Sequence, residues 1–268
     1  MDKTTTLDEP RSRNDSADMA QPKLLLDRTI GELVAERPGR ARVFEGFGMD
    51  YCCGGRRPLR QACRELKVDP FEAVRRLEQE DERLGDRLRD EPDWARASLA
   101  ELADHIETTH HAYLRHELPR LDGLTEKVVS AHGMRHPEMI ALRDAFLALR
   151  DELEPHMTKE EQVYFPFCRA LERAASEGRQ PFRSSDVNSG GGSTQALIHE
   201  HDAAGNLLAR IRKLADNFVP PADACNTYRA MLDGLASLEA DMHQHVHKEN
   251  NILFPRAIAI EAAMAERN

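Results

Sequence analysis

The chain of 268 residues carries 47 acidic side chains against 37 Lys and Arg, which gives a formal charge of −10 at pH 7. This acidic balance excludes the clustered basic surface of a nucleic-acid-binding protein, so we expect no nucleic-acid partner. No run reaches the roughly 18 apolar residues of a membrane span, and the start lacks the apolar stretch of a cleaved signal. We therefore expect a cytoplasmic protein without membrane contact.

The first third of the chain predicts a tail followed by a small helical domain. Residues 1–22 are polar and nearly free of large apolar residues, so we expect them to be disordered. Residues 23–90 contain a predicted capping box, Thr29 with Glu32, and a second helix start at Asp69 and Pro70. The charged stretch 78–94 should join this domain to the rest. We expect the domain's core to contain Leu33, Val34, Val43, Phe44, Phe47, Leu59, Leu66, Phe71, Val74 and Leu77.

Two adjacent cysteines, Cys52 and Cys53, stand in a glycine-punctuated turn at 47–55. One interpretation is a pair of small buried residues, and Tyr51 could equally belong to the core. Flanking glycines and an exposed turn instead favour thiol chemistry. A disulfide between neighbours would be strained and readily reduced, so the dithiol is a candidate two-electron donor or transient iron ligand. We predict Cys52 and Cys53 as catalytic residues.

Apolar residues at spacings of three and four predict four more helices, at 95–123, 137–173, 193–217 and 222–262. Pro181 and three successive glycines within 177–193 indicate a flexible crossover between the second and third helices. Pro166 and Pro255 fall inside predicted helices. Each should remove a backbone hydrogen bond and bend its helix.

The strongest signal is an internal repeat. His156 and Glu160, with Phe165 and Pro166 after them, recur 89 residues later as His245, Glu249, Phe254 and Pro255. Residues four apart on a helix point into the same space, so each His and Glu can converge on one ligand. A single such pair would more often be a surface His beside a Glu. Two copies in register favour metal binding, and imidazole with carboxylate suits iron, manganese or zinc.

The repeat extends upstream, because His111 aligns with His201 at an offset of 90. Each unit is then a helical hairpin, and two hairpins predict an all-α four-helix bundle at 95–262 with metals in its core. Six ligands exceed the needs of one tetrahedral zinc and fit two metals, with two imidazoles on each and both carboxylates bridging. We expect two non-haem iron ions with an oxo or hydroxo bridge, although the residues alone do not distinguish iron from manganese. The predicted metal ligands are His111, His156, Glu160, His201, His245 and Glu249.

Other histidines compete with these or lie elsewhere. On the first bundle helix, His105, His110 and His116 are alternatives to His111, and His105 lies close to the same face, beside the ligands or at the site's entrance. His199 points about 160° away from His201, which favours His201. His243 and His247 are expected on the solvent side of the last helix, and His132 and His136 on the surface near the end of the bundle.

The repeat, together with Asp50-Tyr51-Cys52-Cys53-Gly54-Gly55 ahead of it, resembles the Repair of Iron Centres family over residues 23 to 260. The resemblance implies a hemerythrin-like bundle behind a small dicysteine domain. It also implies a bridged di-iron site, with the four predicted histidines as terminal ligands and the two glutamates as bridges. Damaged iron-sulfur proteins are the implied partners.

Several functions remain open on the sequence. The leading hypothesis is repair of iron-sulfur clusters after oxidative or nitrosative stress, by iron donation or by reduction of nitric oxide to nitrous oxide, so enzyme activity is left open. The alternative is a hemerythrin-like protein that binds or senses oxygen or nitric oxide without turnover, and a third is an iron store. The sequence leaves open the reductant, whether the protein is a homodimer, and how the cysteines lie relative to the metals.

Overall fold

The computed structural model describes residues 25–84, 92–179 and 193–266. The expected tail at 1–22, the middle of the charged join and most of the 177–193 crossover lie outside these residues. The described residues form helices and no β-strand. The β-type pairing among them is a single isolated bridge between Thr29 and Pro58. No helix among the described residues is both long and apolar enough to cross a membrane.

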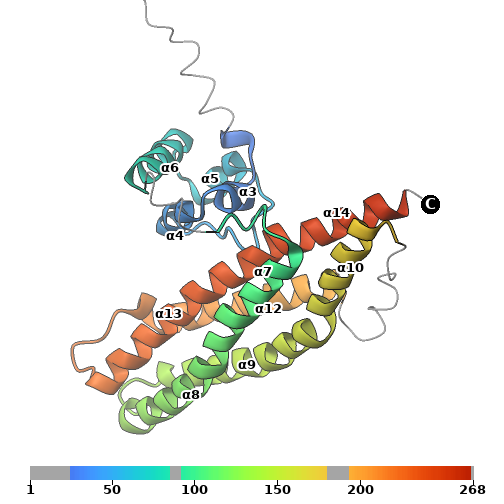
Figure 1. Ribbon diagram of the computed structural model, residues 1–268. Helices are drawn as coiled ribbons and strands as arrows, with labels where there is room; N and C mark the ends of the chain where they lie inside the picture. The colour runs from blue at the N-terminus through green and yellow to red at the C-terminus, as the bar shows by residue number, and fades with distance from the viewer. Residues whose placement is uncertain (1–24, 85–91, 180–192, 267–268) are drawn as a thin grey trace, which may run out of the picture.

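Residues 25–84 form the N-terminal unit, drawn in blue to teal in Figure 1. Both predicted helix starts are confirmed. At the first, the Thr29 side chain accepts a hydrogen bond from the backbone N–H of Glu32, and the Glu32 side chain accepts one from the backbone N–H of Thr29, which is a capping box. At the second, Asp69 accepts a hydrogen bond from the backbone N–H of Phe71. These contacts satisfy backbone donors that a helix leaves unpaired at its start. The elements are α3 (Ile30–Glu36), the 3₁₀ turn η1 (Pro38–Arg40), α4 (Ala41–Phe47), α5 (Leu59–Leu66) and α6 (Pro70–Leu84).

The predicted core of this unit is right for most of its members and wrong for two. Leu33, Phe44 and Leu77 are fully buried. Leu66 is 46% exposed and Phe71 is 65% exposed. Leu66 is the last residue of α5 and Phe71 lies in the first turn of α6, so both exposed side chains belong to helix ends.

Four long helical rods form the bundle (Figure 1). The first runs to His132, beyond the predicted end at residue 123, because Thr125 and Val128 continue its buried face. The rods are α7 (Leu99–His105), η3 (Ile106–His111) and α8 (Ala112–His132); α9 (Glu138–Lys159), η4 (Glu160–Tyr164) and α10 (Phe165–Glu177); α12 (Thr194–Leu214), followed by the 3₁₀ turn η5 (Asp216–Phe218); and α13 (Asn226–Lys248), η6 (Glu249–Leu253) and α14 (Phe254–Ala265).

The helices pair as α9 with α12 and α8 with α13. Two apolar clusters fill the bundle. One gathers residues such as Leu114, Phe146 and Leu235 along the middle of the four rods, and the other gathers residues such as Leu102, Phe165 and Phe254 towards α7, α10 and α14. Along each rod, the predicted ligands stand in sequence between residues of the two clusters. The bundle thus surrounds its polar residues with apolar packing on both sides.

Three π-helical turns, η3, η4 and η6, interrupt the rods at the predicted ligands. In η4 the N–H of Phe165 donates to the carbonyl of Glu160, five residues back, and in η6 Phe254 does the same to Glu249. In η4 and η6, but not in η3, a proline stands two residues after the end of the turn, as Pro166 and Pro255. A proline ring clashes with the carbonyl four residues earlier in an α-helix, so the wider turn relieves the clash. The helix distortion predicted at Pro166 and Pro255 is thus a π-helical turn just before each proline.

Candidate metal centre

The six predicted ligands converge in the bundle core, and we call them together the metal centre. Four rods contribute, because His111 ends η3, His156 and Glu160 flank the α9–η4 junction, His201 lies on α12, and the last two flank the α13–η6 junction. All six side chains are between 0% and 4% exposed. Burying ionisable groups this completely is costly unless they are paired or bind a cation.

The four imidazoles form two facing pairs. In the first pair, Nε2 of His111 lies 3.2 Å from Nε2 of His245. In the second pair, Nε2 of His156 lies 3.0 Å from Nε2 of His201. Each pair therefore aims two imidazole nitrogens at one point, as two ligands of one metal do.

Each carboxylate of the metal centre spans both imidazole pairs. For Glu160, Oε2 lies 3.3 Å from Nε2 of His111 in the first pair, and Oε1 lies 3.4 Å from Nε2 of His156 in the second. Glu249 does the same for the other two imidazoles, at 3.1 Å from Oε1 and 3.2 Å from Oε2. The donors consequently form two groups of four that share both glutamates.

The carboxylates are short of hydrogen-bond donors. Both side-chain oxygens of Glu160 and Oε2 of Glu249 are buried without a hydrogen-bond partner among the described residues. Buried polar atoms in native proteins are almost always satisfied, and each exception calls for an explanation such as an ion. The donor set of four nitrogens and four carboxylate oxygens fits two cations of the iron, manganese or zinc class.

The charges of the protein's own groups favour a cation at this place. Burial opposes the charged form of Glu249, but the facing imidazoles of His245 and His201 outweigh it and hold the carboxyl pKa well below its usual range. Burial likewise opposes a charged His156, yet the carboxylate of Glu160 raises its pKa to about 10. Complete burial lowers the pKa of His245. Without a metal, His156 therefore holds a proton that a bound cation would displace.

Acceptors behind three of the imidazoles fix their orientation. Nδ1–H of His111 donates to Glu161 at 2.7 Å, and Nδ1–H of His201 donates to Asn250 at 2.9 Å. Glu161 and Asn250 occupy the same position of the repeat, 89 residues apart. Such partners fix the tautomer that leaves Nε2 free to bind a metal.

The remaining two imidazoles differ from one another. Nδ1–H of His156 donates to Glu200 at 2.7 Å, and this hydrogen bond, with Lys159 as a second partner, lowers the pKa of Glu200 to about 2. The repeat equivalent of Glu200 is His110, whose ring instead stacks parallel on His245 at 5.3 Å. Nδ1 of His245 is left without a partner among the described residues. The two halves of the centre are thus unequal.

Sequence reasoning missed Glu161, Glu200 and Asn250. They adjoin predicted ligands, and a comparison of flanking positions between the repeat copies could have drawn attention to them. Of the competing histidines, His116 and His199 are exposed. His105 is half-buried and stacks on Trp94 at 4.1 Å, with its ring 5.6 Å from that of His110, so it lies near the centre.

Two expectations for histidines are wrong. His247 is 3% exposed rather than on the solvent side, because the N-terminal unit covers this face of α13 and places the Tyr51 ring 5.5 Å away. His243 is half-buried beside the same tyrosine. His132 is 7% exposed rather than a surface residue, because the loop before α13 brings Cys225 against it. His136 is partly buried.

The dicysteine turn, residues 50–55, packs against the bundle within one chain. The predicted exposure of the turn is wrong for Cys52, which is 6% exposed, whereas Tyr51, at 1%, belongs to the core as one interpretation allowed. Asn251 of η6 donates from Nδ2 to the carbonyl oxygens of Tyr51 at 3.2 Å and Cys52 at 3.0 Å. Cys53 Sγ–H donates to the backbone carbonyl of His201 at 3.6 Å, so the turn touches the helix that carries a residue of the metal centre.

Asp50 holds the two thiols in place. Its carboxylate accepts hydrogen bonds from the backbone N–H groups of Cys52, Cys53 and Gly54. The two sulfur atoms lie 4.0 Å apart, and Cys53 is the more accessible of the pair. The hydrogen bond with Cys53, burial and the nearby Asp50 charge raise the pKa of Cys52 well above its ordinary value, which keeps this thiol protonated.

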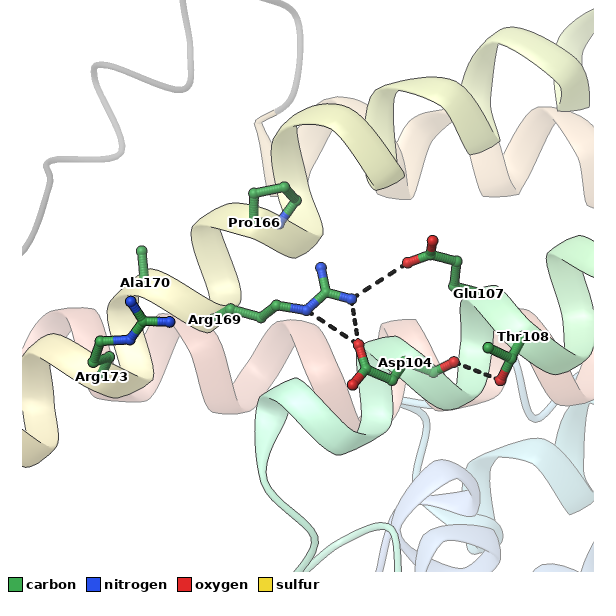
Figure 2. Close-up of a pocket in the computed structure, with 7 residues that line it drawn as sticks. All are labelled: Asp104, Glu107, Thr108, Pro166, Arg169, Ala170 and Arg173. Atoms are coloured by element: carbon green, nitrogen blue, oxygen red, sulfur yellow. Dashed lines mark hydrogen bonds and ion pairs between the residues drawn. The ribbon is translucent and has the colours of Figure 1, made fainter.

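A separate shallow cavity of about 670 Å³ lies between α7–η3 and α10 (Figure 2). Arg169 reaches across this cavity and donates hydrogen bonds to the carboxylates of Asp104 and Glu107. The charges of these three side chains are therefore paired with one another. Its lining includes no member of the metal centre: Asp104, Glu107, Thr108, Pro166, Arg169, Ala170 and Arg173.

The bundle and its buried donors match a known class of protein. Residues 102–257 match the hemerythrin HHE cation binding domain, and residues 26–81 match a domain of unknown function, DUF542. The bundle is therefore a hemerythrin-type cation-binding domain, as the sequence predicted.

Similarity to known proteins over most of the chain identifies the family within this class of cation-binding proteins. The chain is 38% identical over 237 residues to the iron-sulfur cluster repair protein YtfE of Enterobacter sp. (strain 638), which covers 88% of this chain and 98% of the relative. At the same coverage, it is 36% identical over 239 residues to the YtfE protein of Escherichia coli O81 (strain ED1a) and 34% over 236 residues to that of Musicola paradisiaca (strain Ech703). The chain belongs to this family of iron-sulfur cluster repair proteins.

Proposed function

We propose that the metal centre holds two iron ions and that the protein uses it to repair damaged iron-sulfur clusters. The first imidazole pair would bind one ion, the second pair the other, and Glu160 and Glu249 would bridge them. One observation carries the proposal: each buried carboxylate faces both imidazole pairs through separate oxygens. Two divalent ions and two carboxylates leave a net charge of +2, which suits a small anionic or polar ligand.

The repair role rests on the similarity of this chain to iron-sulfur cluster repair proteins. Two ferrous ions would supply two electrons, the number needed to convert two molecules of nitric oxide and two protons into nitrous oxide and water. The protein's part is to hold the ions between fixed donors and to exclude bulk water, which the near-complete burial of the six side chains does. Fixed donors in a dry site strengthen electrostatic interactions with bound groups.

The contact of the dicysteine turn with α12 supports a role for Cys52 and Cys53 as electron donors to the centre. Oxidation of Cys52 and Cys53 to a disulfide releases two electrons and two protons, which balances the nitric oxide reaction. The sulfurs would have to close from 4.0 Å to the roughly 2 Å of a disulfide. Since Cys52 is buried and protonated, exchange with an external thiol should begin at the more accessible Cys53.

His156 would bind iron only as a neutral imidazole. With iron bound, the imidazole must be neutral, whereas without metal its pKa near 10 means that it is charged at neutral pH. Glu200 faces this imidazole from behind and would stabilise the charge.

Anaerobic metal analysis, cluster reactivation and single-turnover nitric oxide consumption test the proposal together. We expect two irons per chain, and faster reactivation of a nitrosylated cluster protein than an equal amount of free ferrous iron gives. The double variant Cys52→Ala/Cys53→Ala should keep its iron and lose reactivation, whereas Cys63→Ala, in the core of the same N-terminal unit, should keep both. Reactivation equal to that by free iron, or unaffected by loss of both thiols, would contradict the proposed mechanism.

A further inference from the structure

The peptide group between Cys52 and Cys53 is hydrogen-bonded at both its N–H and its carbonyl. The N–H, which belongs to Cys53, donates to Oδ1 of Asp50 at 2.9 Å. The carbonyl, which belongs to Cys52, accepts from Nδ2 of Asn251 at 3.0 Å. Asp50 stands in the dicysteine turn itself, whereas Asn251 lies on η6 of the bundle. The peptide is therefore held from the N-terminal unit and from the bundle at once.

The same two side chains hold the neighbouring peptide groups of the turn. The Asp50 carboxylate also accepts from the backbone N–H groups of Cys52 at 3.2 Å and Gly54 at 2.9 Å. Asn251 also donates to the carbonyl of Tyr51 at 3.2 Å. The orientation of each peptide group from Tyr51 to Gly54 is thus fixed by a side chain.

A disulfide between the two cysteines needs a different backbone. Consecutive Cα atoms are about 3.8 Å apart across a trans peptide, whereas disulfides usually join Cα atoms that are about 4.4–6.8 Å apart. The two sulfur atoms lie 4.0 Å apart and must approach to about 2 Å. The peptide group between them would have to turn, which draws its N–H from Asp50 and its carbonyl from Asn251. Oxidation also removes the Sγ–H proton through which Cys52 bonds Asp50 at 3.2 Å.

We propose that Asp50 and Asn251 are positioning residues that favour the dithiol form of Cys52 and Cys53 over the disulfide. Their hydrogen bonds to the peptide form in the reduced turn and are lost or weakened on oxidation, so they stabilise the dithiol alone. This inference rests on the electron-donating role proposed for the turn. It adds that the disulfide left after electron donation is easily reduced, and that an external thiol is the reductant.

Reduction of the turn balances with two external thiols. The thiolate of the first attacks Sγ of Cys53, the more accessible sulfur, and forms a mixed disulfide. The bond between the two cysteines breaks with its electron pair on Cys52, which takes up a proton and can bond Asp50 again. The second external thiolate attacks the external sulfur of the mixed disulfide and releases Cys53, which is then protonated. Two external thiols become one disulfide, and two electrons and two protons pass to the turn.

Equilibration of the full-length, iron-loaded protein with glutathione measures this preference. The protein is incubated anaerobically at pH 7 with graded ratios of reduced to oxidised glutathione, and its free thiols are then alkylated. Mass spectrometry of the tryptic peptide 43–56, which contains Cys52 and Cys53 but no other cysteine, gives the fraction of disulfide.

Loss of either positioning residue should shift this equilibrium towards the disulfide. In Asp50→Ala we expect the equilibrium constant for disulfide formation to rise about tenfold, because hydrogen bonds to a charged acceptor are lost. This change lowers the midpoint potential of the pair by about 30 mV. Asn251→Ala should raise the constant about fivefold, because a neutral side chain donates to the same peptide. If Asp50→Ala does not fold, Asp50→Asn keeps the shape of the side chain and should shift the potential in the same direction.

A matched control separates this role from general loosening of the N-terminal unit. The Glu45 carboxylate accepts a hydrogen bond from the hydroxyl of Tyr51 at 3.0 Å, in the same turn. Because that contact involves neither the peptide between the cysteines nor their sulfurs, Glu45→Gln should keep the wild-type potential. A change that only destabilised the fold would lower the unfolding temperature of both redox forms alike and leave the potential unchanged.

The outcomes distinguish this inference from the proposed function. If the wild-type pair forms no disulfide at any glutathione ratio, electron donation by the turn fails and this inference fails with it. If the wild type forms the disulfide, but Asp50→Ala and Asn251→Ala change the equilibrium constant less than about twofold or lower it, only this inference is overturned. A wild-type pair that stays a disulfide in excess reduced glutathione would overturn it as well.

Discussion

Replacing Asn251 with alanine should release the dicysteine turn from the bundle. The Asn251 side chain donates to two backbone carbonyls of the turn, those of Tyr51 and Cys52. Each hydrogen bond contributes a net of roughly 0.5–1.5 kcal/mol, so the variant should lose about 2 kcal/mol of contact between the turn and η6. A loss of this size raises the equilibrium constant for local opening about 30-fold.

The reactivity of Cys52 reports that opening directly. Its side chain is 6% exposed, so an alkylating reagent reaches it only after the turn separates from the bundle. When opening and closing are fast relative to modification, the rate follows the population of the open state. We therefore expect Cys52 in Asn251→Ala to be alkylated about 30-fold faster than in the wild type, as measured by mass spectrometry of its peptide.

Gln162→Ala is the matched control. Gln162 stands 89 residues before Asn251, at the same position of the first repeat copy, and its side chain is exposed. Its replacement should leave the alkylation rate of Cys52 unchanged. A rate in Asn251→Ala within about threefold of the wild type, or an equal increase in both variants, would refute the assignment of Asn251 as the residue that fastens the turn.

Three further predictions concern the centre and the N-terminal unit. Glu160→Gln loses one bridging carboxylate, so iron analysis should find at most one ion per chain. In Gly55→Ala the new Cβ would lie 2.3 Å from Asn251 Oδ1, so thermal unfolding should occur at lower temperature, whereas Gly46→Ala, with open space around its Cβ, should gain about 0.5–1 kcal/mol. Burial, helped by nearby positive charge, lowers the pKa of His105 to about 4, so the folded state binds fewer protons than the unfolded state between pH 6.5 and 4. The free energy of unfolding should fall as pH drops through that window, and His105→Gln should reduce this fall in urea titrations.

The repeat made the convergence of these six buried side chains predictable from the sequence. A His and a Glu four residues apart are common on any charged helix. Their recurrence 89 residues later, with His111 and His201 in register, required a symmetric arrangement in which the same side chains face inward twice. The capping box at Thr29 was equally predictable, because the groups that form it are three residues apart and need no tertiary contact.

Features that depend on distant contacts could not be predicted in the same way. His247 is buried because the N-terminal unit, some 200 positions earlier, lies over α13, and periodicity within α13 carries no information about that unit. The partners behind the imidazoles differ between repeat copies: Glu161 corresponds to Asn250, and Glu200 corresponds to His110. Because these positions have diverged, their roles appear only when the helices are placed together.

The π-turns preserve a history of the chain. Those at Glu160–Tyr164 and Glu249–Leu253 occupy the same place in both copies, so the extra residue that widens each turn was present before the gene segment doubled. The turn at Ile106–His111 has no counterpart in α12, which is unbroken from Thr194 to Leu214, so the two copies differ at this place. A single ancestral hairpin would already have carried one His, the His–Glu pair and the widened turn, and two such molecules side by side would have sufficed to enclose a pair of ions.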